Sequence, residues 1–163
     1  GALVVRVFQN SPADAAGLRQ GDVITAVEGK PVESRESFST HVATAAAGRP
    51  LAITVVRDGD SRNLSVQPVD PPGTLGLDIL DEIAGIGVAD ERRGVMIDRV
   101  SRGSRAAEIG LAPGDYVVGV NGLRIRSVRE LNEEVAKASD RSSIVLSVER
   151  PPYIYNLTFP MGV

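Results

Sequence analysis

The stretch GLRQGDVITAVEGKPV, Gly17–Val32, decides the fold because it recurs as GLAPGDYVVGVNGLRI at Gly110–Ile125. Both copies carry Gly-Leu, then Gly-Asp, then an apolar run, then a closing glycine. Residues 1–67 align with residues 94–160 without a gap, and identities continue along the whole alignment. This repeat is longer than the solenoid repeats of about 20–50 residues. Each copy is therefore predicted to fold as a small domain.

The order of local signals is the same in both copies. A β-branched run predicts a first strand, and a short helix follows it. Ser11 and Ser104 stand at the N-cap of that helix, while Gly17 and Gly110 stand where a glycine would end it. A second strand, a longer helix and two final strands complete each copy.

The longer helices are predicted to begin at Ser34, in SRESFSTHVATAAAG, and at Ser127, in SVRELNEEVAKASD. Ser127 and Glu130 have the spacing of a capping box. Leu131 and Val135 lie one helical turn apart and are expected to face the core. Phe38 and Val42 are expected to do the same in the first copy.

These elements predict a mixed β/α fold that is mainly β. Each copy is expected to form a small, partly open antiparallel barrel or sandwich with two helices. The first domain is predicted to span residues 1–68 and the second residues 73–163. Residues 69–72 form the linker, in which two prolines interrupt regular structure.

Composition excludes several functions. The net charge is −3 and neither half of the chain is basic, so the charge distribution gives no indication of nucleic-acid binding. The chain has no cysteine, which excludes thiol catalysis and disulfides. The single histidine, His41, lies beside apolar helix positions and is interpreted as a surface or packing residue. The sequence shows no Gly-rich serine nucleophile motif, no cluster of metal ligands and no apolar run of about 18 residues. We therefore expect no catalytic residue, metal or cofactor in this chain.

The segment NSPADAAGLRQGDVITAVEGKPV, Asn10–Val32, resembles the signature of PDZ domains of the bacterial type. The second copy, Arg102–Ile125, is similar but has Arg105 where the family prefers proline. Two such copies at this spacing resemble the C-terminal region of HtrA/Do-family envelope serine proteases. The resemblance covers nearly the whole chain.

This resemblance implies a peptide-binding module. PDZ domains bind C-terminal tails or exposed strands, which join the edge of a sheet beside a helix. The implied partners are polypeptide C-termini or unfolded protein segments, in the bacterial periplasm or cell envelope. A trypsin-like protease domain is expected upstream in the intact protein, and assembly of several copies is compatible with the family. The alternative is a tandem PDZ scaffold in a non-protease envelope or secretion assembly. An autonomous enzyme is the least favoured interpretation.

The resemblance also implies a binding site in the second copy. The segment GTLGLDIL, Gly73–Leu80, is similar to the family's carboxylate-binding loop running into the peptide-pairing strand. Asp81–Gly94 would then form a short helix and a loop, with solvated charges such as Asp90 and Arg92. The sequence as given shows no counterpart of this loop and strand ahead of the first copy, so peptide binding by this chain is expected to map to the second copy. The predicted peptide-binding residues are Leu75, Gly76, Leu77, Asp78, Ile79, Val128, Asn132 and Val135.

Overall fold

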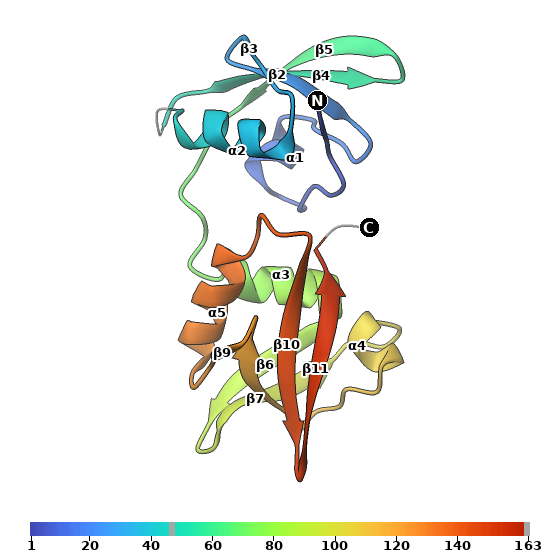
Figure 1. The fold of residues 1–163 in the computed structure, drawn as a ribbon, viewed down its shortest axis with the longest axis vertical. Helices are drawn as coiled ribbons and strands as arrows, with labels where there is room; N and C mark the ends of the chain where they lie inside the picture. The colour runs from blue at the N-terminus through green and yellow to red at the C-terminus, as the bar shows by residue number, and fades with distance from the viewer. Residues whose placement is uncertain (46–47, 162–163) are drawn as a thin grey trace. The chain divides into compact units, whose positions relative to one another are not determined.

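The computed structural model describes residues 1–45 and 48–161. The chain divides into two compact units between Asp70 and Pro71, and each is described here by itself (Figure 1). Each unit holds one antiparallel sheet with short helices, which confirms the mainly β mixed fold. Residues 46–47 of the first predicted long helix and residues 162–163 of the second predicted domain lie outside the described residues.

Unit 1 builds its sheet in the order β1-β2-β4-β5, with β3 paired to β2. Fully buried Val27 and Val55 lie at its centre. Its elements are β1 (Ala2–Leu3), α1 (Pro12–Ala15), β2 (Val23–Val27), β3 (Lys30–Pro31), α2 (Arg35–Ala43), β4 (Leu51–Arg57) and β5 (Asp60–Val66).

Unit 2 builds its sheet in the order β11-β10-β8-β7-β6, with β9 paired to β8. The repeat relates β7, β8, β10 and β11 to β1, β2, β4 and β5 of unit 1, and β6 has no counterpart among the described residues of unit 1. Its elements are α3 (Leu75–Ala84), β6 (Ile86–Glu91), β7 (Gly94–Val100), α4 (Arg105–Glu108), β8 (Tyr116–Val120), β9 (Leu123–Arg124), α5 (Val128–Lys137), β10 (Ser143–Arg150) and β11 (Tyr153–Pro160).

The predicted helix caps form. The Ser11 and Ser104 side chains accept hydrogen bonds from backbone N–H groups in the first turns of α1 and α4. Ser127 caps α5 by accepting from the N–H of Glu130. The Glu130 carboxylate, however, accepts from the N–H of Arg126 at 2.8 Å. In a regular capping box the Glu130 carboxylate would accept from the N–H of Ser127, so this second bond is displaced by one residue.

Segment 73–94 differs from its prediction. Leu75–Ala84 is a ten-residue helix, whereas Gly73–Leu80 was expected to be a loop and a strand. The alternation of Leu75, Leu77 and Ile79 fits a strand, but the spacing of Ile79 and Ile83 also places two apolar side chains on one helical face. Both isoleucines are buried, and packing of this face decides for the helix. The predicted helix and loop of Asp81–Gly94 is the end of α3 followed by strand β6.

The apolar faces of the two long helices are buried to different degrees. Leu131 and Val135 on α5 are fully buried, as predicted. Phe38 on α2 packs at the edge of the core of unit 1, but Val42 is 37% exposed, so its predicted core position is wrong. Helix α3 packs on α5 in unit 2, and the described residues of unit 1 form no counterpart of α3 or β6.

A buried carboxylate follows the repeated glycine in both units. Asp22 is 1% exposed and accepts from the Nε of Arg57 at 2.6 Å and from its Nη2 at 2.8 Å. The same guanidinium donates to the carbonyl of Gly17, and the N–H of Arg19 donates to Asp22. This cluster ties the loop after α1 to the end of β4.

Unit 2 repeats the cluster with the same geometry. Arg150 donates to both carboxylate oxygens of Asp115 at 2.7 Å and to the carbonyl of Gly110 at 2.8 Å. The N–H of Ala112 donates to Asp115 at 2.9 Å. Two charged hydrogen bonds in parallel fix both the distance and the orientation of the two side chains. The loop after α4 is thereby held to the end of β10.

Replacing Asp22 by alanine is expected to lower the free energy of unfolding of unit 1 by about 3 kcal/mol, because Arg57 and the Arg19 N–H lose a buried acceptor. Urea denaturation followed by circular dichroism measures the change. Asp81→Ala is the matched control, since its pair with Arg99 has a 2.7 Å distance but exposed side chains. That control should lose less than about 1 kcal/mol. Equal losses in the two variants would contradict the structural role of Asp22.

Acid should weaken both units through these clusters. The hydrogen bond from Arg57 holds the pKa of Asp22 below its ordinary value of 3.8, and Arg150 does the same to the pKa of Asp115, although burial opposes both shifts. Each group therefore adds stability above the ordinary Asp pKa, and this stability is lost as the pH falls through the lowered pKa. The free energy of unfolding should decrease from about pH 5 to about pH 2. An Asp22→Asn/Asp115→Asn double variant should show a shallower decrease, and an unchanged slope would refute the assignment.

Candidate functional site

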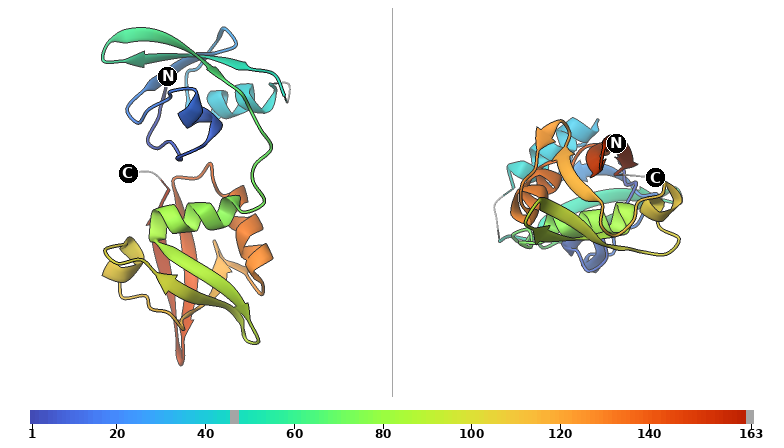
Figure 2. Two further views of the ribbon diagram at one scale, coloured as in Figure 1. Left: turned by 180° about the vertical axis from the view of Figure 1, so that it is seen from behind. Right: turned by 90° about the horizontal axis from the view of Figure 1, so that it is seen from below.

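The eight residues predicted to bind peptide lie on two helices rather than on a strand and a helix. Helix α3 crosses one end of unit 2 and leads into β6 (Figures 1 and 2). Helix α5 packs against α3. The first group, Leu75, Gly76, Leu77, Asp78 and Ile79, is on α3, and the second, Val128, Asn132 and Val135, is on α5.

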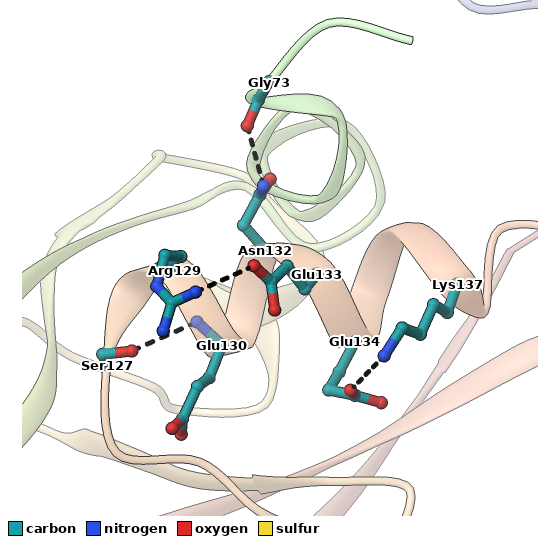
Figure 3. A network of polar contacts seen from close by, with 8 residues as sticks. All are labelled: Gly73, Ser127, Arg129, Glu130, Asn132, Glu133, Glu134 and Lys137. Atoms are coloured by element: carbon teal, nitrogen blue, oxygen red, sulfur yellow. Dashed lines mark hydrogen bonds and ion pairs between the residues drawn. The ribbon is translucent and has the colours of Figure 1, made fainter.

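Gly76, at the start of α3, lies against the backbone of Asn132 on α5. A Cβ atom at Gly76 would collide with the backbone of Asn132, so only glycine allows this close approach. The Asn132 side chain accepts from the N–H of Leu77 at 3.1 Å and donates to the carbonyl of Gly73 at 2.8 Å. Figure 3 shows this side chain reaching from α5 to the start of α3. Asn132 therefore fastens the first turn of α3.

The carboxylate-binding loop predicted within Gly73–Leu80 does not form in this arrangement. The N–H of Leu75 donates to the carbonyl of Pro72 at 3.0 Å, and the N–H of Leu77 is taken by Asn132. Ile79 and Val135 are fully buried, so neither faces a ligand at the surface. The structure thus brings Gly76 and Leu77 to Asn132, but as a helix contact.

Strand β6 forms the outer edge of the sheet of unit 2. Ile97 on β7 donates to the carbonyl of Asp115 and accepts from the N–H of Gly114, so its backbone faces away from β6. Val88 lies directly opposite Ile97. In an antiparallel pair of this kind, both residues turn their N–H and C=O groups away from each other. Val88, and Asp90 two residues on, therefore direct these groups outward from the sheet.

Helix α5 lies beside this edge and is tied to it. The Asp90 carboxylate accepts from the N–H of Val128 at 2.8 Å, across 38 positions of sequence. Asp90 thus supplies a negative charge and an acceptor at the start of α5, where backbone N–H groups lack partners within the helix. It was interpreted from sequence as a solvated charge. The alternation of Ile86 and Val88 before a turn was the signal for strand β6.

The candidate site is therefore the outward edge of β6 with the neighbouring face of α5. Among the described residues, no group of three or more His, Cys, Asp or Glu side chains is placed to hold a metal ion. Within the same residues, no helix is long and apolar enough to span a membrane. The Nε2 of His41 lies 3.1 Å from the carbonyl oxygen of Pro31.

Comparison with known proteins identifies similarity to one protein family in both halves of the chain. PDZ-domain models match residues 1–67 and 96–150. A DegP-like periplasmic serine endoprotease of Chlamydia trachomatis is 35% identical over 162 residues, covering 92% of this chain and 32% of that protein. Periplasmic serine endoprotease DegP of Escherichia coli is 32% identical over 154 residues, with the same two shares. A solved HtrA3 PDZ domain bound to a phage-derived ligand is 28% identical, covers 44% of this chain and 64% of its own, and has a TM-score of 0.34. The chain spans about a third of the length of these curated relatives.

Replacing Asp90 by alanine is expected to lower the free energy of unfolding of unit 2 by about 1 kcal/mol, because the start of α5 loses a charged acceptor. Chemical denaturation compared with Glu91→Ala, an exposed neighbour of the same charge, measures this effect. The Glu91 variant should stay within about 0.5 kcal/mol of the parent chain. If both variants behaved alike, the bond to Val128 would contribute nothing to stability.

Proposed function

Because this chain belongs to the PDZ family and consists of two consecutive PDZ domains, we propose that it captures polypeptide C-termini or exposed strands of unfolded proteins. In this mode of recognition an extended peptide joins the edge of a sheet beside a helix. The observation that carries the proposal is the outward edge of β6 next to α5. Val88 and Asp90 offer main-chain donors and acceptors there, which bind any extended chain largely independently of its sequence.

Side chains beside the edge supply selectivity. Val128, in the first turn of α5, is half-buried and would favour an apolar residue in the peptide. Ala89 on β6 is likewise half-buried. Ligands with small to medium apolar residues are therefore expected, with affinities of about −7 to −8 kcal/mol, in the micromolar range.

The relatives support a wider role as well. The curated relatives are named periplasmic serine endoproteases, and this chain matches their PDZ part. We infer that it is the substrate-recognition and regulatory region of an HtrA/DegP-like protease of the bacterial periplasm or envelope. Its two domains are taken to span residues 1–68 and 73–163. Recognition of unfolded segments would then deliver substrate to the protease domain of the intact protein.

Titration with a peptide tests the binding function. The probe is a ten-residue peptide ending in Tyr-Val-Val, added to the isotope-labelled chain while backbone amide resonances are recorded. Amides of Val88, Ala89 and Asp90, and of the first turn of α5, are expected to shift with a micromolar dissociation constant. A decapeptide of the same length with alternating Asp and Gly is the control and should cause no shift. Shifts confined to residues away from β6 and α5 would overturn the proposed site.

A further inference from the structure

The proposed function leaves open which kind of segment the second domain takes. A free C-terminus differs from an internal segment by its carboxylate. Recognition of that charge needs several backbone N–H groups that converge on it without other partners. In a domain that binds by strand addition, these groups belong at the start of the pairing strand. Residues Ala84–Ile86 hold that position in unit 2.

The start of β6 is sealed by the last turn of α3. Gly85 has a left-handed backbone and ends the helix, and its N–H donates to the carbonyls of Leu80 and Asp81 at 3.1 and 2.9 Å. Its carbonyl accepts from the N–H of Ser101 at 2.8 Å. A Cβ at this glycine would collide with the Ser104 side chain. Both the N–H and the C=O of Gly85 are therefore already hydrogen-bonded within the protein.

Burial agrees with this hydrogen bonding. Ala84 is 1% exposed and Ile86 is 2% exposed, so the residues on either side of Gly85 are also covered. Val88, Ala89 and Gly87 farther along β6 are only half-buried. The start of β6, where a terminal carboxylate would lie, is thus inaccessible to a ligand. The part of β6 with which the rest of a peptide would pair is accessible.

The start of α3 is held against α5. Gly76 and Asn132 bring the backbones of the two helices into contact, and the Asn132 side chain accepts from the N–H of Leu77 and donates to the carbonyl of Gly73. Ile79, Leu80 and Ile83 are buried on the inner side of the helix. Moving α3 away would expose these apolar side chains to water, which opposes opening.

From these observations we propose that the second PDZ domain binds internal extended segments and does not distinguish them from free C-termini, because α3 seals the carboxylate end of β6. The inference rests on the proposed peptide site and adds its class of substrate. The occupant is an extended stretch of an unfolded polypeptide whose chain continues beyond the site. Recognition then depends on hydrogen bonds to the main chain of Val88 and Asp90. It also depends on apolar side chains of the bound segment that lie next to Val128.

The test compares three probe peptides on the full 163-residue chain. They share one ten-residue sequence ending in Tyr-Val-Val and carry a free carboxylate, a C-terminal amide, or a further Gly-Ser-Gly-Ser. Dissociation constants for the second domain come from the amide shifts of residues 87–91. The three constants are expected to agree within about twofold. A free-carboxylate peptide that binds at least tenfold more tightly, about 1.4 kcal/mol, would overturn the inference while the proposed function stands. Absence of shifts with every peptide would overturn both.

Variants show whether α3 is the cause. Gly76→Ala places a methyl group against the backbone of Asn132 and should displace α3, so the free-carboxylate peptide should gain at least threefold over the amide. Gly73→Ala is the matched control, because a Cβ there meets no atom within 4 Å, and its ratio should stay near one. If Gly76→Ala does not fold, Asn132→Ala removes the two hydrogen bonds instead. Faster hydrogen exchange in α3 without any change in the ratio would refute the role of the helix.

Discussion

The bidentate pair between a buried aspartate and an arginine is the constraint on which each unit depends. Asp22 and Arg57 are 35 positions apart, and Asp115 and Arg150 are separated by the same interval. The carboxylate also accepts a backbone N–H from the preceding loop, and the guanidinium donates to a carbonyl in that loop. One ion pair therefore fixes the loop after the short helix against the end of a long strand.

This constraint explains why the Gly-Asp step recurs in both copies. A carboxylate that is almost fully buried is unfavourable unless charge and hydrogen bonds compensate for its lost hydration. Arg57 compensates Asp22, and its own side chain is only 12% exposed. Arg150 is 51% exposed, so the second pair is more open to solvent. The two units share the geometry but differ in how far water reaches it.

The difference between the units lies at the edge of the sheet. In unit 2, α3 packs on α5, and Val135 is fully buried. The corresponding Val42 in unit 1 is 37% exposed. In unit 2, a glycine and an asparagine side chain set how close the start of α3 lies to α5.

The sequence by itself determined the duplication, the order of strands and helices, the caps at Ser11, Ser104 and Ser127, and the membership in the PDZ family. These features depend on local patterns, and each pattern occurs twice, so that one copy supports the interpretation of the other. Only the tertiary structure decided segment 73–94 and the site. The spacing of its apolar residues is compatible with either a strand or a helix. The helix is selected by contacts such as the hydrogen bond from the N–H of Leu77 to the side chain of Asn132, 55 positions away. Local spacing carries no information about a partner at that distance, and for the same reason Asp90 could not be assigned to α5 before the chain was folded.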